Sequence, residues 1–406
     1  MYQIRRVKIG KTAQLDELAH ACGELYTQTL VSFWRTVRHK GVWLGKKHLM
    51  RWHTSPKLHA HTSDACVQAF FAALKSWRER HKTDPVARPP RRRKWYFRIE
   101  YKRSAMSLKD GALSLSNGRG NAPLALEWPW DLPQTVVIRW TGQQYEAIAT
   151  YKQEQPGEQP IGDKIAGIDL GEVHMAVSHD GVQTHILNGR LLRSKRQYQN
   201  KLKEHLSKRI ARKKKGSRRR KKLIASKKRQ LTTLTHQIRD IEHKQTTALI
   251  STLHENGVQT VVMGDVRAIR HDLDVGSTTN QKLHQWSHGH TRHLLTYKAE
   301  RRGMEVVLQE ESYTSRTCPA CGHRKKSSPT GRNFGCSTCG FRFHRDGVGA
   351  INIRAKYQGK FGHSLVVAVM APATGIRYLP HTRVARSATL GRENVCMGNY
   401  AETAGL

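Results

Sequence analysis

The stretch that decides the fold is "IAGIDLGEVHMAVSHDGVQTHIL", at residues 165–187. It opens with an apolar run that ends in Asp169, turns at Leu170-Gly171, and continues as a second, alternating segment. An apolar run bounded by turn residues is typical of a strand buried in a sheet. The stretch therefore predicts two consecutive strands, with a carboxylate at the end of the first.

Two more buried strands are expected downstream, in "VQTVVMGDV" (258–266) and "GMEVVLQEE" (303–311). Residues 195–254 carry apolar positions at helical spacing. Strands that alternate with helices indicate a sheet of the α/β type. Lys and Arg make up 14 of the 22 residues from Lys208 to Arg229, so we expect a helical hairpin with a basic tip.

The N-terminal part has a different sequence pattern, in which expected helices are followed by short alternating segments. Residues 12–34 and 63–80 are expected to be helices, the second with Ser63 as its N-cap. Residues 95–154 are short alternating segments, typical of a small antiparallel barrel or sandwich. The aromatic run 95–97 belongs either to the core of that barrel or to a surface that stacks on bases.

Charge indicates the partner. The chain has 406 residues, of which 37% are hydrophobic, so it can bury real cores, and it carries a formal net charge of +40. A surface this basic repels itself, and a polyanion, above all nucleic acid, is the partner that relieves the repulsion. Adhesion to acidic surfaces in general is the alternative.

The N-terminus "MYQIRRVKIG" has no signal-peptide core and no apolar run of about 20 residues occurs, so we expect a soluble intracellular protein without a membrane partner.

Four of the seven cysteines lie close together, in two Cys-x2-Cys pairs separated by 14 residues. They are Cys318, Cys321, Cys336 and Cys339. This spacing is typical of a four-thiolate zinc ribbon, in which each pair supplies one knuckle and the ion has a structural role. The glycine after each pair is expected in a tight turn with positive φ.

Two aspartates are candidate ligands of a different kind. Asp169 ends an apolar strand, and Asp346 lies at an expected helix N-terminus, seven residues after the last cysteine of the ribbon. Acids placed in this way can converge on Mg²⁺, and two such ions would support cleavage of a phosphodiester. For either aspartate alone, a capping or turn role is the alternative.

Five segments together resemble one known family. They are "GIDLG" (167–171), "VVMGDV" (261–266), "LLTYKAERRGMEVV" (294–307), "SYTSRTCPACG" (312–322) and "FGCSTCGFRFHRDGVGAINI" (334–353). Their order and separations resemble TnpB, the transposon-encoded RNA-guided nuclease family related to type V CRISPR effectors. The N-terminal part is similar only in its layout.

The resemblance implies an α/β multidomain fold. It consists of a RuvC-like (ribonuclease H-type) nuclease domain with an inserted four-cysteine zinc ribbon, and an N-terminal antiparallel β-barrel (wedge) interrupted by a helical recognition domain. The expected boundaries are 1–11 and 85–155 for the wedge, 12–84 for the recognition domain, 162–311 and 346–358 for the nuclease domain, 312–345 for the ribbon, and 359–406 for a C-terminal tail that is expected to be partly disordered.

The resemblance also implies an activity and its partners. The activity is RNA-guided cleavage of DNA next to a short flanking motif, with a guide RNA derived from the transposon end and a double-stranded DNA target. Two Mg²⁺ ions, or Mn²⁺, would serve the nuclease site, and Zn²⁺ the ribbon. A monomer, cytoplasmic and nucleoid-associated in a prokaryote, is expected.

The sequence departs from the family at two positions. Val348 stands where an asparagine usually follows the last aspartate, and Gly264 stands where the family's catalytic glutamate usually ends its strand. Asp169 and Asp346 match the family's two aspartates. Asp265 could substitute for the glutamate, but adjacent strand residues face opposite ways.

Glu310 or Glu311 could supply the missing acid from the next strand. Some relatives look similar in carrying a glutamate about this far downstream, and Glu311 matches that position better than Glu310, so we predict that Asp169, Glu311 and Asp346 converge. Ordinary exposed acids are the alternative for this pair. A third possibility is a nuclease-inactive protein.

Two basic segments are candidates for contact with the nucleic-acid backbone. They are Arg91, Arg92, Arg93 and Lys94 in the first, and Lys213, Lys214, Lys215, Arg218, Arg219 and Arg220 in the second. Three functions stay open: an RNA-guided endonuclease, an RNA-guided repressor that binds without cleaving, and a transposase or an accessory protein of one.

Overall fold

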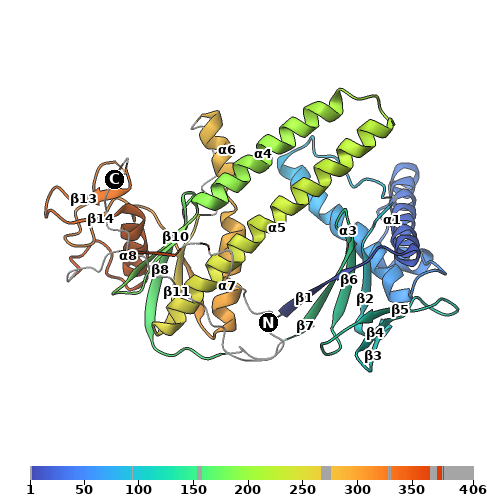
Figure 1. Ribbon diagram of the computed structural model, residues 1–406, viewed down its shortest axis with the longest axis horizontal. Helices are drawn as coiled ribbons and strands as arrows, with labels where there is room; N and C mark the ends of the chain where they lie inside the picture. The colour runs from blue at the N-terminus through green and yellow to red at the C-terminus, as the bar shows by residue number, and fades with distance from the viewer. Residues whose placement is uncertain are drawn as a thin grey trace. The chain divides into compact units, whose positions relative to one another are not determined.

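The computed structural model describes residues 2–93, 95–152, 158–266, 276–327, 329, 331–365, 373–376 and 378, without the side chains of 277–279 and 282. The chain forms two compact units, Met1–Glu154 and Gln155–Leu406 (Figure 1). Lys94 and most of the predicted tail 359–406 lie outside the described residues.

Unit 1 contains two antiparallel sheets, ordered β1-β7-β6-β2 and β3-β4-β5. The strands are β1 (Tyr2–Ile9), β2 (Ile99–Lys102), β3 (Met106–Lys109), β4 (Ala112–Leu115), β5 (Leu124–Glu127), β6 (Thr135–Trp140) and β7 (Tyr145–Lys152), with a short 3-10 helix at Arg103–Ala105. Buried and exposed positions alternate along β5 and β7. The antiparallel architecture predicted for 95–154 is therefore confirmed, and β1 joins it from the start of the chain.

Three helices complete unit 1: α1 (Ala13–Lys40), α2 (Lys46–Trp52) and α3 (Ala60–Thr83). The two predicted helices are present and α2 was not predicted. The prediction of Ser63 as an N-cap is wrong. The α3 helix begins three residues earlier, where Nδ1 of His59 accepts a hydrogen bond from the backbone N–H of His61 at 3.2 Å. Ser63 is buried inside the helix.

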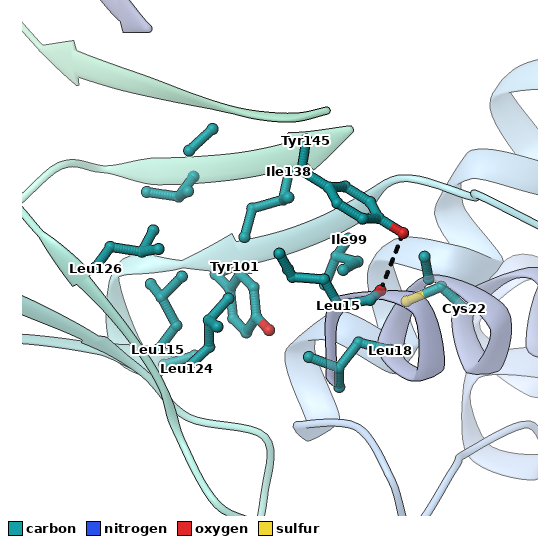
Figure 2. Packing of buried hydrophobic residues seen from close by; sticks show 14 of the residues in the cluster. Leu15, Leu18, Cys22, Ile99, Tyr101, Leu115, Leu124, Leu126, Ile138 and Tyr145 are labelled. Carbon is teal, nitrogen blue, oxygen red and sulfur yellow. Dashed lines mark hydrogen bonds between the residues drawn. The ribbon is translucent and has the colours of Figure 1, made fainter. Parts of the chain in front are cut away.

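The core of unit 1 joins α1 to the sheets. Figure 2 shows Leu15 and Cys22 of α1 pointing toward Ile99 and Tyr101 of β2. The hydroxyl of Tyr145 donates to the carbonyl of Leu15 at 3.3 Å. A second apolar cluster, which includes Phe33, Leu49 and Phe70, lies among the three helices. Helices and strands thus share the first of these two clusters, and the predicted boundary between wedge and recognition domain stays a prediction.

Unit 2 is built on a mixed six-stranded sheet, ordered β12-β11-β8-β9-β10-β15. The strands are β8 (Lys164–Asp169), β9 (His174–His179), β10 (Thr184–Asn188), β11 (Val258–Gly264), β12 (Glu305–Gln309) and β15 (Thr374–Ile376). Strands β8, β11 and β12 are parallel neighbours, so their carboxyl ends lie at one edge. β15 lies within the predicted tail 359–406 and pairs with β10, so at least these three residues belong to the sheet. The boundary of the tail stays a prediction.

The helices of unit 2 are α4 (Arg190–Ala211), α5 (Arg218–Glu255), α6 (Ser277–Gln285), α7 (His288–Arg301) and α8 (Arg345–Tyr357), with a small hairpin of β13 (Asn333–Gly335) and β14 (Arg342–His344). The predicted helical hairpin is confirmed as α4 and α5, two long helices joined at the basic tip (Figure 1). Among the described residues no helix combines the length and the apolar character needed to span a membrane.

Candidate functional site

The carboxyl ends of three parallel strands define the candidate site. Asp169 is the last residue of β8, and its neighbour Ile168 pairs with Met263 of β11. Gly264 ends β11 and pairs with Gln309, the last residue of β12. Asp169, Gly264 and the residues just after β12 therefore lie at the same edge of the sheet, because the three strands are parallel.

Glu311 reaches the space that a side chain at position 264 would take. A methyl group on Gly264 would collide with Oε2 of Glu311 and would lie 3.3 Å from its Cδ. The absence of a side chain at residue 264 is therefore what allows the Glu311 carboxylate to lie at the end of β11. The space beside the end of β11, which a side chain at residue 264 could fill, is filled here by the side chain of Glu311, which follows β12.

Helix α8 carries the third carboxylate to this edge. Asp346 is in its first turn, as predicted, and is buried. One turn along, α8 approaches β8 so closely that a methyl group on Gly349 would lie 2.5 Å from Oδ2 of Asp169. The close approach fixes the first turn of the helix beside the end of β8.

Electrostatic coupling joins Asp169 and Glu311. Burial raises the pKa of Asp169 well above its usual value, and the negative charges of Glu311 and Asp346 raise it further. Burial, helped by the charges of Asp265 and Glu310, raises the pKa of Glu311 to about 7. Carboxyl groups held in this way resist ionisation unless a cation compensates them.

Asp346 has a different environment from the other two acids. Burial acts to raise its pKa, but a hydrogen bond with His174 and the nearby charges of His344, Arg332 and Arg345 bring the pKa down to about 2. Nδ1 of His174 lies 2.9 Å from Oδ2 of Asp346, and Nη1 of Arg332 donates to the same oxygen at 3.0 Å. Asp346 is therefore ionised across the physiological range.

The ligand atoms of Asp346, His174 and His344 all lie within 4.8 Å of one another, a group that the sequence did not indicate. In the described ranges, the carboxylates of Asp169, Glu311 and Asp346 do not form a group that tight. Two-metal sites hold ions roughly 3.5–4 Å apart, so ligands of different ions need not meet this limit. Convergence of the three acids on shared ions stays a prediction.

The two backup acids lie beside the site in different ways. Glu310 is exposed and pairs with Lys356 at 2.5 Å, which helps to lower its pKa to about 2. Asp265 lies 3.9 Å from Arg292 and acts on Glu311 through its charge. Glu310 thus has the surface environment that was the alternative for both glutamates, whereas Glu311 is turned inward.

Asn352 is a residue that sequence reasoning missed. Its buried side-chain amide donates to the carbonyl of Thr314 at 2.6 Å and to that of Thr317 at 2.7 Å. The hydroxyl of Thr314 in turn donates to the carbonyl of Glu311 at 2.8 Å. This chain of hydrogen bonds ties α8 to the segment that carries Glu311. An asparagine facing inward from an apolar helix was the available signal.

Val348 has a packing role. It is fully buried and forms one apolar cluster with Cys318, Phe334 and Cys336 of the cysteine-rich segment. A valine there joins α8 to the ribbon, whereas an asparagine would bury an amide among apolar groups.

The four cysteines come together as predicted. The Sγ atoms of Cys318 and Cys339 are 3.7 Å apart and those of Cys321 and Cys336 are 3.6 Å apart. Tetrahedral zinc with Zn–S distances of about 2.3 Å requires sulfur atoms about 3.8 Å apart, so the cluster fits the ion. The glycines after the two pairs have positive φ, +72° and +74°, which confirms the predicted turns.

Comparison with known proteins agrees with this geometry. A family model described as "Cas12f1-like, TNB domain" matches residues 288–353, and one described as "Probable transposase" matches residues 149–270. A TnpB-like protein of Methanocaldococcus jannaschii is 32% identical over 124 residues, which cover 30% of this chain and 44% of the relative. These matches support a TnpB-family protein, related to the type V effectors.

Two further similarities extend beyond the immediate relatives of this TnpB-family protein. The CRISPR-associated endodeoxyribonuclease Cas12f1 of Sulfoacidibacillus thermotolerans is 29% identical over 203 residues, 47% of this chain and 45% of that protein. The chain in a cryo-EM structure of a Cas12f1-sgRNA-target DNA complex is similar in fold, with a TM-score of 0.51, 14% identity and coverage of 84% of this chain and 81% of that one. The TnpB-family chain spans about half the length of the curated relatives it matches.

The predicted basic contacts of the TnpB-family protein fall into two environments. Arg91, Arg92 and Arg93 are exposed after α3, and the hydroxyl of Thr27 donates to the backbone carbonyl of Arg93 at 2.5 Å. Lys94 lies outside the described residues. The end of the first basic segment is therefore attached to α1, and its three described arginines are exposed to solvent.

At the tip of the hairpin, five of the six predicted residues are exposed: Lys213, Lys214, Lys215, Arg218 and Arg219. Arg220 is half-buried, and its guanidinium donates to the carbonyls of Ile210 and Lys213, both at 3.0 Å. These bonds tie the first turn of α5 to the end of α4 and to the turn between the two helices. Arg220 thus has a structural task that its place in the basic run did not reveal.

Proposed function

We propose that this TnpB-family protein is an RNA-guided DNA endonuclease. It would cleave guide-matched DNA next to a short flanking motif by metal-dependent hydrolysis in a RuvC-like site. The observation that carries the proposal is the Glu311 carboxylate, which lies against Gly264 at the strand edge and is electrostatically coupled to Asp169.

Asp169, Glu311 and Asp346 would hold the metal. Their donor set consists of carboxylate oxygens alone, which suits hard cations such as Mg²⁺, or Mn²⁺. When bound, two such ions supply stabilisation of the attacking and leaving oxygens of the phosphodiester. The raised pKa values of Asp169 and Glu311 fit this task, because acids that repel one another gain most from a bound cation.

Positive groups beside the carboxylates would help to admit an anionic substrate. Arg332 and Arg345 each lie within ion-pair distance of Asp346, at 3.0 Å and 3.3 Å. Without them, three acids at one edge would repel a phosphate backbone. Asp346 is held ionised by these contacts, so it would need no proton loss before it binds a metal.

The partners follow from the charge and from the relatives. A net charge of +40 fits a protein that neutralises many phosphates. The similar Cas12f1 structure is a complex with an sgRNA and a target DNA, and the curated Cas12f1 relative is an endodeoxyribonuclease. We therefore propose a guide RNA from the transposon end, a double-stranded DNA target, zinc in the four-cysteine ribbon, and a monomeric, cytoplasmic protein.

Cleavage of a guide-matched plasmid tests the proposal. The protein is purified with its copurifying RNA, the RNA is sequenced, and a plasmid that carries the matching site beside randomised flanking bases is incubated with the complex and Mg²⁺. We expect cleavage that requires the match, the flanking motif and the metal. Glu311→Gln should abolish it and Glu310→Gln, the matched control, should not. A complex that binds the plasmid without cutting it would refute the nuclease.

A second candidate, the RNA-guided binder without nuclease activity, is favoured by one observation. Both carboxylate oxygens of Asp346 already accept from arginines, Oδ2 from Arg332 and Oδ1 from Arg345. If those pairs persist in the complex, Asp346 is less available to a metal. The same plasmid assay separates the two functions, because the binder protects the matched site from other nucleases and leaves it uncut.

A further inference from the structure

A pocket lined mainly by polar residue types lies in unit 2, and none of the three carboxylates is part of its lining. It is an open pocket of about 310 Å³, lined by residues of α4 and α5 and by Gln285, Ser287 and His290 at the junction of α6 and α7. The residues that matter for its chemistry are Arg196, Asn200, Arg239, Glu242, Gln285 and Ser287. Ile238 is an apolar side chain in the lining. A site of this composition suits a polar ligand that offers several hydrogen-bonding atoms.

Glu242 in the lining of the cavity is held by several neighbouring side chains. Glu242 is 2% exposed, and its carboxylate accepts from Arg196 at 2.5 Å and from the hydroxyl of Ser287 at 2.8 Å. His290 lies 3.4 Å from the other carboxylate oxygen. A buried carboxylate engaged in this way is held in place and has little remaining capacity for a metal ion. Arg196 is held by the same group of contacts, because its Nη2 donates to Glu242 and to the hydroxyl of Ser287.

Other lining groups have no partner of their own. In the part of the chain that the structure describes, no hydrogen bond or ion pair engages the side chains of Asn200, Arg239 or Gln285. All three are half-buried. Two amides, each with a donor and an acceptor, therefore face the cavity together with a guanidinium. Amides match the mixed donor and acceptor edges of nucleobases, and a guanidinium binds phosphate or stacks on a base.

We propose that this cavity binds one unpaired nucleotide of single-stranded RNA. A volume of about 310 Å³ is at the lower end of the range for ligand sites and leaves no room for a duplex. Sequence-specific RNA recognition typically takes up unstacked bases from single-stranded segments. The same two helices carry exposed lysines at their tip, so one RNA strand could contact both features. This inference rests on the guide RNA of the proposed function.

Single-stranded oligomers test the cavity without any target DNA. The probes are fluorescein-labelled RNAs of about ten nucleotides, made of U, A or C alone, and the corresponding DNAs. The variant is Asn200→Ala/Gln285→Ala, and the control is Gln237→Ala, an exposed amide on α5 outside the cavity. We expect the double variant to bind at least one RNA about tenfold more weakly, as two lost hydrogen bonds imply. The salt dependence should not change, because no charge is removed.

Equal affinities of the wild type and the double variant for every RNA would overturn the proposal, as would an equal loss for DNA and RNA of the same base. Photocrosslinking of 4-thiouridine RNA to the wild-type protein provides a second readout that needs no variant. Crosslinks to α4 or α5 beside the cavity support it, and their absence there overturns it. Because neither assay contains target DNA or magnesium, a failure of the nuclease proposal would leave these results unaffected.

Discussion

At Gly264 the missing side chain has a direct consequence for Glu311. The glutamate carboxylate lies where a Cβ at residue 264 would be, so the two positions compete for one space. We therefore predict that a glutamate at the end of β11 and a glutamate after β12 are alternative ways to supply one acid at this edge of the sheet. A side chain at residue 264 would therefore require the Glu311 carboxylate to move from its present place.

This competition predicts a rescue. Gly264→Glu alone should abolish cleavage and destabilise unit 2 by about 1–3 kcal/mol, because the added side chain overpacks the site. Glu311→Gly alone should also be inactive. The double variant Gly264→Glu/Glu311→Gly should regain activity, measured as the initial rate of plasmid cleavage. A folded double variant that is no more active than either single variant would contradict the exchange.

The pKa of Glu311 predicts how stability depends on pH without added divalent metal. Its pKa is about 7 in the folded protein against an ordinary value of 4.5, so between these values the folded state binds more protons than the unfolded state. Stability should therefore fall as pH rises from about 5 to 8, by on the order of 2 kcal/mol from this group. Urea unfolding at several pH values measures it.

The control for this pH dependence is the neighbouring glutamate. Glu311→Gln should reduce the fall in stability, whereas Glu310→Gln should not, because the pKa of exposed Glu310 is already lowered to about 2. Mg²⁺ should stabilise the wild type more at pH 8 than at pH 5, since it binds the ionised carboxylates. Identical pH profiles of stability for the wild type and Glu311→Gln would show that folding does not raise the pKa of Glu311.

Among the elements, the α4–α5 hairpin separates charge from structure within a single basic run. Lys213, Lys214 and Lys215 extend into solvent, while Arg220 closes the turn through the carbonyls at the end of α4. The two kinds of residue should respond differently to substitution.

We predict that Lys213→Ala/Lys214→Ala/Lys215→Ala weakens RNA binding and reduces the slope of log affinity against log salt by about 2, since each phosphate contact contributes about 0.7–0.9. The triple Lys→Arg variant keeps the charge and should behave like the wild type. Arg220→Ala should instead lower the stability of the hairpin, seen as faster amide exchange at residues 210–217. An unchanged salt slope in the alanine variant would exclude these lysines from phosphate contact.

At the scale of the whole molecule, the cysteine cluster and the acidic site are mechanically linked within unit 2. Val348 of α8 shares an apolar cluster with Cys318 and Cys336, and Asp346 lies two residues before it. The backbone of Leu365 also donates to the carbonyl of Pro319 in the first knuckle, at 3.0 Å. Loss of the ribbon should therefore disturb the start of α8.

We predict that Cys321→Ser abolishes stoichiometric zinc, destabilises unit 2 and increases amide exchange over residues 346–353, because the energy of metal binding is folding energy in such sites. Metal content by atomic absorption and hydrogen exchange measure the two effects. Cys66→Ala is the control, because this thiol is buried in unit 1 and should leave the zinc content unchanged. Protection of α8 that survives the loss of zinc would show that the ribbon does not support the helix.

The sequence by itself determined the strands, the hairpin, the pairs of cysteines and the placement of Asp169 and Asp346 at the ends of elements. Each of these depends on neighbours a few residues away, through periodicity, turns and ligand spacing. It also narrowed the candidates for the acid that Gly264 cannot supply to Asp265, Glu310 and Glu311, because all three lie where strands end.

The resemblance favoured Glu311, and the tertiary structure shows how the surroundings of these acids differ. Glu310 is drawn to Lys356 at the surface, whereas Glu311 fills the space beside Gly264, and neither contact has a local signal. The pairing of β10 with β15 and the hydrogen bonds of Asn352 likewise join residues far apart in the chain. Their positions follow from how α8 and the sheet pack together, because packing, not local pattern, decides which of two adjacent side chains faces inward.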